Sequence, residues 1–123
     1  MNNTVLVVDD SPTVVKFVTY SLKSSGLKVL TASDGMDAME KVSSLDSAVD
    51  LVITDLNMPN MDGYELIATL RQSEQYSRTP IIILSSEEDE ADKAMGEEAG
   101  ADSYLTKPFK SSVLLNEVKK YLE

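Results

Sequence analysis

Short apolar runs alternate with longer amphipathic segments along the whole chain. The runs occupy residues 5–8, 29–32, 51–54 and 81–84, with a weaker run at residues 104–105. Each run is continuous, without the alternation of apolar and polar residues seen in half-exposed strands, which is typical of strands covered on both faces. We therefore predict five buried strands, all far too short to cross a membrane.

The segments between these runs carry apolar residues with helical spacing. The apolar faces are Val14, Val15, Val18 and Leu22; Ala38, Met39, Val42 and Leu45; Leu66, Ile67 and Leu70; and Leu114, Leu115, Val118 and Leu122. Residues 88–99 contain few large apolar side chains and predict the weakest helix. Repeated strand–helix units predict an α/β fold, with a parallel sheet and helices on both of its faces.

Start and stop signals support these boundaries. Ser11 followed by Pro12 is typical of a helix N-cap with proline at the first helical position. Gly26 and Gly100 are typical helix terminators. Asp62, with a glutamate three residues later, has the form of a capping box.

Length and composition indicate one globular domain, residues 1–123. The chain has 123 residues, of which 42% are hydrophobic and 26% charged, which suffices for a single core and excludes the disordered class. The opening MNNTVLVV lacks the features of a secretory signal. The absence of cysteine excludes disulfides, thiolate metal sites and a cysteine nucleophile. We expect a protein of the reducing cytoplasm, without membrane insertion.

Charge and histidine content narrow the function further. The formal net charge is −10, and the 11 basic residues are scattered, which argues against direct nucleic acid binding. The chain contains no histidine, which excludes a Ser-His triad, imidazole metal ligands and a phosphohistidine role for this chain.

Reactive side chains follow most of the predicted strands. Asp9 and Asp10 follow the first strand, Asp55 the third, Ser85 ends the fourth, and Lys107 follows the fifth. Ligands of parallel α/β sheets bind at the carboxyl ends of the strands, so we expect these groups to converge. Clustered carboxylates repel one another unless a divalent cation binds, and hard oxygen ligands select magnesium, calcium or manganese.

The same set of groups suits phosphoryl transfer. A cation, an ammonium group and a hydroxyl can surround one phosphoryl group. A central carboxylate can itself attack phosphorus and form an aspartyl phosphate. Ser11 and Asp62 already provide the helix caps that would otherwise explain Asp9, Asp10 or Asp55. We therefore assign a chemical role to those three carboxylates, and Asp55 is the predicted nucleophile.

Four segments together resemble a known family. VLVVDDS, DLNMPNMDG, PIIILSS and AGADSYLTKPF follow one another along the chain. They are similar to motifs of the receiver domain of bacterial two-component response regulators, most of all the stand-alone chemotaxis (CheY-like) type. The resemblance implies a flavodoxin-like, doubly wound sheet of five parallel strands, ordered 2-1-3-4-5 and flanked by five helices.

The resemblance also implies individual roles. Asp55 matches the phosphoacceptor, Asp10 a direct metal ligand and Asp9 its acidic neighbour that acts through water. Asn57 matches the residue whose backbone carbonyl binds the metal, although asparagine before a turn is also common for local reasons. The implied cofactor is Mg²⁺, with Mn²⁺ as an alternative.

The remaining roles concern switching. Ser85 matches the switch hydroxyl and Tyr104 the switch aromatic, although a half-buried tyrosine can also serve packing alone. Lys107 matches the lysine that pairs with phosphate, and its bond to Pro108 is expected to be cis. Asn57 and Glu87 match positions that tune hydrolysis, whereas the rest of the acidic run 87–90 suits a solvated helix start.

Together these features predict a phosphorylation-activated signalling switch. A histidine kinase or a histidine phosphotransfer protein donates to Asp55 in trans. The protein is not an enzyme beyond its own phosphorylation and dephosphorylation. Output is expected through protein contacts on the face of the fourth helix, fifth strand and fifth helix. Whether the receiver stands alone or comes from a larger regulator stays open.

Three other functions fit the sequence less well. A haloacid dehalogenase-type phosphohydrolase would need an Asp-x-Asp loop after the first strand and a cap domain. A flavodoxin-like flavin carrier would need a phosphate-binding loop where Asp9 and Asp10 stand, and these would repel the flavin phosphate. A degenerate receiver used only for docking would not need the complete motif set.

Overall fold

The computed structural model describes residues 3–45, 47–86 and 90–122. Strands and helices alternate strictly along the chain. Their bounds are β1 (Thr4–Val8), α1 (Pro12–Ser24), β2 (Lys28–Ala32), α2 (Gly35–Ser43), β3 (Leu51–Asp55), α3 (Gly63–Gln72), β4 (Ile81–Ser86), α4 (Glu90–Ala99), β5 (Ser103–Lys107) and α5 (Ser111–Tyr121).

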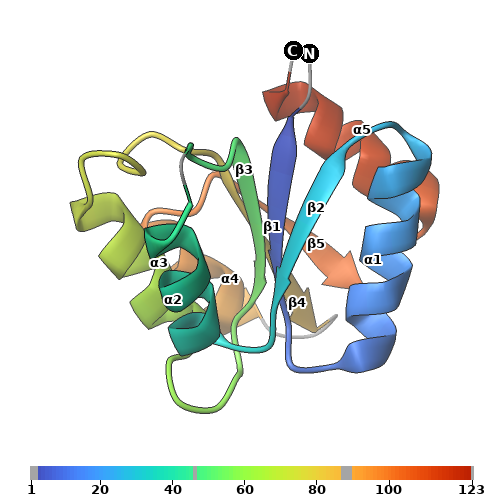
Figure 1. Ribbon diagram of the computed structural model, residues 1–123. Helices are drawn as coiled ribbons and strands as arrows, with labels where there is room; N and C mark the ends of the chain where they lie inside the picture. The colour runs from blue at the N-terminus through green and yellow to red at the C-terminus, as the bar shows by residue number, and fades with distance from the viewer. Residues whose placement is uncertain (1–2, 46, 87–89, 123) are drawn as a thin grey trace.

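The strands form one parallel sheet, ordered β2-β1-β3-β4-β5. This order and the five helices confirm the predicted doubly wound fold. Helices α1 and α5 cover one face of the sheet, and α2, α3 and α4 cover the other (Figure 1). The strand order reverses at β1 and β3, so a ligand site is expected at the carboxyl ends of these two strands.

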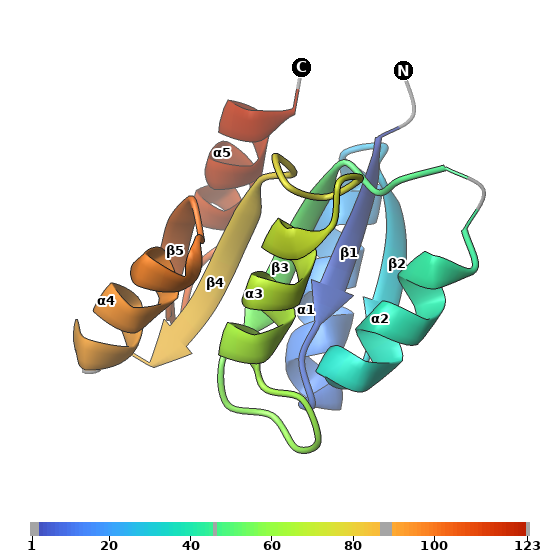
Figure 2. The ribbon, with the colours of Figure 1, turned by 90° about the vertical axis from the view of Figure 1, so that its left-hand side faces the viewer.

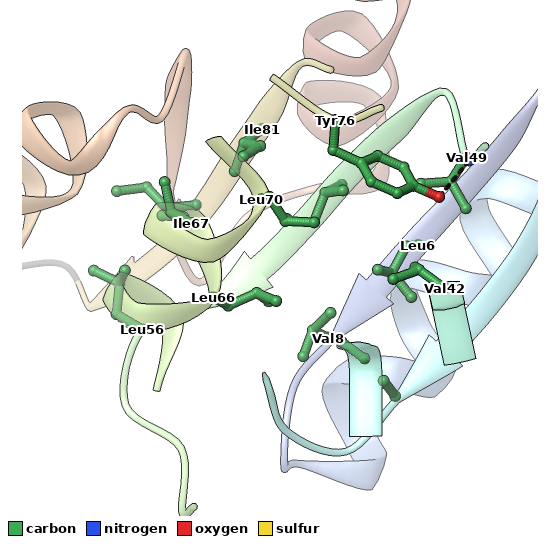
Figure 3. Close-up of a cluster of buried hydrophobic side chains, with 14 residues drawn as sticks. Leu6, Val8, Val42, Val49, Leu56, Leu66, Ile67, Leu70, Tyr76 and Ile81 are labelled. Atoms are coloured by element: carbon green, nitrogen blue, oxygen red, sulfur yellow. Dashed lines mark hydrogen bonds between the residues drawn. The ribbon is translucent and has the colours of Figure 1, made fainter. Parts of the chain in front are cut away.

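Each face of the sheet has its own apolar core. One core joins alternate residues of β1, β3 and β4 to α2 and α3, and the other joins the remaining strand residues to α1 and α5. Tyr76 closes the first core, and its hydroxyl accepts a hydrogen bond from the backbone N–H of Val49 at 3.4 Å (Figure 3). Because both faces are covered, the central strands are continuous apolar runs.

The predicted caps lie where the sequence placed them. The Ser11 hydroxyl accepts from the Val14 N–H at 3.4 Å, directly before Pro12. Asp62 accepts from the Glu65 N–H at 2.9 Å and begins α3. Past the helix ends, Gly26 and Gly100 adopt φ angles of 86° and 121°, which glycine accommodates without steric cost.

Helix α2 ends earlier than its apolar pattern predicts, and the predicted weak helix is present as α4. The apolar spacing predicts Leu45 on the same helical face as Ala38 and Val42, but α2 ends at Ser43 and Leu45 is exposed beyond it. The poorly apolar α4 packs closely through Gly96, where a Cβ atom would lie 2.6 Å from Ile83 Cδ1. A small residue, not a large apolar one, brings this helix onto the sheet.

Arg71 ties the end of α3 to the turn between α4 and β5. Its guanidinium donates to the carbonyl oxygens of Gly100 at 2.9 Å and Thr79 at 2.8 Å, and to the Asp102 carboxylate at 2.9 Å. This network lies at the amino ends of the strands, away from the carboxylates. No helix in the described ranges is long and apolar enough to cross a membrane.

Candidate functional site

Three carboxylates meet at the carboxyl ends of β1 and β3. One oxygen from each of Asp9, Asp10 and Asp55 lies within 4.8 Å of the other two. Asp9 is buried, Asp55 is partly buried and Asp10 is exposed. The predicted convergence is therefore present, and its most accessible member is Asp10.

Lys107 reaches this cluster from the end of β5. Its Nζ atom lies 3.2 Å from Oδ2 of Asp9 and 3.5 Å from Oδ1 of Asp55. The other Asp9 oxygen accepts from the Ser11 N–H at 2.9 Å. Both oxygens of the buried Asp9 are thus engaged by the protein, as a buried charge requires. Asp9 thereby also anchors the start of α1.

Asp55 is less fully compensated. Its Oδ1 atom accepts from the Leu56 N–H at 2.9 Å and faces Lys107. Burial, followed by repulsion from Asp9, raises the pKa of Asp55, and Lys107 opposes this only in part. The carboxylate is therefore held in an environment that disfavours its negative charge and would gain from another positive group nearby.

The donor set fits a hard divalent cation. Carboxylate oxygens within 4.8 Å of one another are the ligands that magnesium accepts. A cation would relieve the repulsion that raises the Asp55 pKa. Asp9 is bonded through both of its oxygens, to the Ser11 N–H and to Lys107, whereas the Leu56 N–H bonds only Oδ1 of Asp55 among the described residues.

The predicted switch residues lie on β4 and β5. Ser85 is buried, and its Oγ atom makes no hydrogen bond to the described part of the protein. It stands one residue beyond Leu84, which pairs with Asp55 across β3 and β4. Tyr104 is 41% exposed on β5. The peptide bond between Lys107 and Pro108 is cis, as expected.

The loop after Asp55 brings a second set of residues to the site. Asn57 is exposed within this loop, which closes where the Gly63 N–H donates to the Leu56 carbonyl oxygen at 2.9 Å. At its far side, the Asn60 side chain donates to Asp34 at 2.7 Å. Glu87, predicted to tune hydrolysis, lies outside the described residues.

Asp34 and Asn60 were not among the predicted site residues. Each carries a turn signal in the sequence, since Asp34 precedes a glycine and Asn60 follows a proline. Such signals indicate local backbone shape only. Their contact joins residues 26 positions apart, which no local pattern reveals.

Known proteins share both the sequence and the fold. Residues 5–119 match the response regulator receiver domain. The chain is 39% identical to protein PilG of Pseudomonas aeruginosa over 118 residues, which cover 96% of this chain and 86% of PilG. The structure of the chemotaxis protein CheY4 of Vibrio cholerae matches with a TM-score of 0.91 and 36% identity, over 99% of this chain and 100% of that one.

A third similar protein has a solved structure that contains a metal ion. The receiver domain of the sensor histidine kinase PA1611 of Pseudomonas aeruginosa matches with a TM-score of 0.88 and 28% identity, over 98% of each chain. That structure holds a magnesium ion coordinated in its active site cleft. These similarities do not favour a phosphohydrolase or a flavin carrier. The chain belongs to the response regulator receiver domain family, whose members are the signalling switches of phosphorelays.

Proposed function

We propose that Asp55 is the residue at which this receiver accepts its phosphoryl group. The observation that carries the proposal is the position of its carboxylate, at the end of β3, 3.5 Å from the Lys107 ammonium and within 4.8 Å of two further carboxylates. A partly desolvated carboxylate on a rigid strand is a suitable nucleophile, because little must reorganise as it attacks.

The reaction is a transfer from nitrogen to oxygen. One Asp55 oxygen attacks phosphorus, the bond between phosphorus and the donor's imidazole nitrogen breaks, and the electron pair of that bond returns to the imidazole. Lys107, whose Nζ atom lies 3.5 Å from Asp55 Oδ1, would neutralise a phosphoryl oxygen on Asp55. A histidine kinase or a histidine phosphotransfer protein is the proposed donor, in trans because this chain contains no histidine.

Magnesium is the proposed cofactor. Asp10, Asp55 and the backbone carbonyl of Asn57 would hold it, and Asp9 would act through water. When bound, the ion neutralises negative charge on the phosphoryl oxygens. Apart from its own phosphorylation and dephosphorylation, the chain is proposed to catalyse nothing. The cytoplasm, where ATP-dependent kinases work, is the proposed location.

The switch is proposed to run from Ser85 to Tyr104. The Ser85 hydroxyl is buried one residue beyond the strand partner of Asp55 and can donate to a phosphoryl oxygen there. Its movement would open space into which Tyr104 can turn. Large apolar side chains are exposed on α4, β5 and α5, namely Met95, Tyr104 and Val113. This face is the proposed surface for a downstream protein.

Intact mass measurement tests the acceptor. The chain is incubated with magnesium and a small phosphodonor, and wild type should gain one phosphoryl group that alkaline conditions remove. Asp55→Asn should gain none. Asp50→Asn makes the same charge change at the amino end of the same strand, where Asp50 accepts from the Thr4 N–H at 2.8 Å, and should be labelled normally. Equal labelling of Asp55→Asn and wild type would refute the proposal.

A further inference from the structure

The loop of residues 56–62 is attached to the beginning of α2. Asn60 Nδ2 donates to Asp34 Oδ2 at 2.7 Å, and the Gly35 N–H donates to the Met61 carbonyl oxygen at 2.9 Å. In both ribbon views the loop between β3 and α3 lies beside the start of α2 (Figures 1 and 2). The loop that begins directly after Asp55 is therefore joined to an element that is distant in sequence.

Asp34 serves both elements with one carboxylate. Its Oδ1 atom accepts from the Asp37 N–H at 2.8 Å and caps α2, while its Oδ2 atom accepts from Asn60. The residue is only 8% exposed. Hydrogen bonds from the Asp37 N–H and from Asn60 lower the pKa of Asp34, so the carboxylate is ionised at neutral pH and both oxygens act as acceptors.

The contact is shaped by the backbone on both sides. Asn60 has a φ of 66°, in the left-handed region that asparagine tolerates better than most residues. A Cβ atom at Gly35 would lie 2.5 Å from Met61 Cγ and 2.6 Å from the Met61 carbonyl oxygen. Only glycine permits this approach of α2 to the loop. The loop therefore has one closely defined position against α2.

We propose that Asp34 and Asn60 are positioning residues whose hydrogen bond, here called the loop latch, holds the 56–62 loop in the shape that binds the divalent cation. The inference rests on the proposed function, in which the Asn57 carbonyl is a ligand. That carbonyl lies between the bond from Gly63 to Leu56 at the base of the loop and the latch at its far side. Neither latch residue is itself a ligand.

The physical reason is preorganisation. A loop that must become ordered as the ion binds loses conformational entropy at that moment, and this loss weakens binding. Asn60→Ala removes the latch without removing any proposed ligand. We expect it to weaken magnesium binding about tenfold, the lower end of the range for residues that support metal ligands.

Magnesium titration of the whole metal-free chain by calorimetry measures this effect. Asn60→Ala is compared with Tyr76→Phe, which removes a different hydrogen bond, the one from Val49, in the core. Both variants should melt at lower temperature, but only Asn60→Ala should lose magnesium affinity. Asn60→Gly keeps the left-handed backbone free of strain and should lose affinity as well, so the result does not depend on one variant folding.

An exchange of the two side chains separates positioning from general damage. In Asp34→Asn combined with Asn60→Asp, the Asn side chain at 34 can still cap α2 through its oxygen and donate to the Asp side chain at 60. The total charge is unchanged. Asn60→Asp alone sets two carboxylates against each other and breaks the donor–acceptor match, whereas the exchange restores it, so magnesium affinity should return towards that of wild type.

The outcomes are distinct. If Asn60→Ala and Asn60→Gly bind magnesium as wild type does, or if the folded exchange variant recovers no affinity, the latch is refuted while the proposed function stands. If wild type itself neither binds magnesium nor gains a phosphoryl group, the proposed function fails and the latch fails with it. Loss in the three Asn60 variants, to Ala, Gly and Asp, with recovery in the exchange supports the latch.

Discussion

Gly63 and Asp55 are in such close contact that a Cβ atom at position 63 would lie 2.3 Å from the Asp55 carbonyl oxygen. The same Cβ atom would lie 2.8 Å from the Cα atom of Leu56. The first residue of α3 therefore supports the backbone that carries the proposed acceptor. The sequence DG at this place serves two purposes, since Asp62 caps α3 and Gly63 allows the helix to begin against the end of β3.

Gly63→Ala should therefore displace Asp55. Overpacking of this kind costs about 1–3 kcal/mol of unfolding free energy, and the shift of Asp55 should slow its phosphorylation. Rates come from mass spectra after timed exposure to a small phosphodonor with magnesium. Gly26→Ala is the control, because its φ of 86° makes alanine strained there while no atom lies within 4 Å. Gly26→Ala should lose stability and keep the phosphorylation rate of wild type. Equal phosphorylation rates in wild type, Gly26→Ala and Gly63→Ala would contradict the expectation.

Removal of two buried hydroxyls, those of Ser85 and Thr54, should have opposite effects on stability. Thr54 Oγ1 donates to the Asp55 carbonyl oxygen at 2.8 Å, whereas Ser85 Oγ makes no hydrogen bond to the described protein. Removing a satisfied buried hydroxyl costs about 1 kcal/mol, but removing an unsatisfied one relieves a desolvation cost. Without magnesium, Thr54→Val should thus lower the unfolding free energy, and Ser85→Ala should leave it unchanged or raise it.

Denaturant unfolding of the two metal-free variants checks this pair. The same Ser85→Ala protein should still accept a phosphoryl group at Asp55, yet lose the Tyr104-dependent part of the change in tyrosine fluorescence that phosphorylation is expected to cause. If Ser85→Ala destabilises the metal-free chain as much as Thr54→Val does, its hydroxyl has a structural role that the proposed switch does not include.

Asp55 should also make stability depend on pH. Burial raises its pKa above the ordinary value of 3.8, so the folded chain holds this proton more tightly than the unfolded chain does. The contribution of Asp55 to stability is then fully present below its ordinary pKa and is lost as pH rises through the folded-state pKa. Asp55→Asn carries no such charge, so without metal it should be more stable than wild type at neutral pH.

The measurement is the difference in unfolding free energy between wild type and Asp55→Asn, taken across acidic to neutral pH without divalent cations. Other titrating groups affect both proteins and largely cancel in the difference. The advantage of the variant should shrink as pH falls towards the ordinary aspartate pKa. A difference that stays constant over this range would mean that the Asp55 charge is not held under strain.

The carboxylate cluster could be predicted from the sequence because it follows from the direction of the strands in a parallel sheet. The carboxyl ends of parallel strands lie on the same side of the sheet, so Asp9 and Asp55 are expected to be near one another once both strands are identified. The same reasoning placed Lys107 near them. It did not show that Lys107 lies closer to Asp9 than to Asp55, because that preference depends on how the side chains pack after the edge has formed.

Contacts made across the fold were beyond prediction for a related reason. Arg71 looked like an ordinary charged residue at the end of a helix, yet it binds the turn after α4, 29 residues away. Leu45 was misplaced because apolar spacing continues past the true end of α2. Apolar periodicity identifies buried faces, but it contains no information about which distant backbone groups need a partner.

Magnesium should stabilise the folded chain through Asp10. This carboxylate is exposed and raises the pKa of Asp55 by repulsion, so Asp10→Asn should increase the stability of the metal-free chain. The same change removes a proposed ligand. A ligand that binds only the folded state adds about 2.7 kcal/mol at a hundredfold excess over its dissociation constant, and the variant should lose most of this gain.

Both effects must occur together, because both arise from one carboxylate. Thermal melts with and without magnesium test them in wild type, Asp10→Asn and Asp50→Asn. Asp50 has the same charge, but its carboxylate accepts a hydrogen bond from the Thr4 N–H at the amino ends of the strands. Asp50→Asn should therefore be less stable without metal and should keep the full magnesium gain. If Asp10→Asn behaves in the same way as Asp50→Asn, the cation is held by other residues and Asp10 is not its ligand.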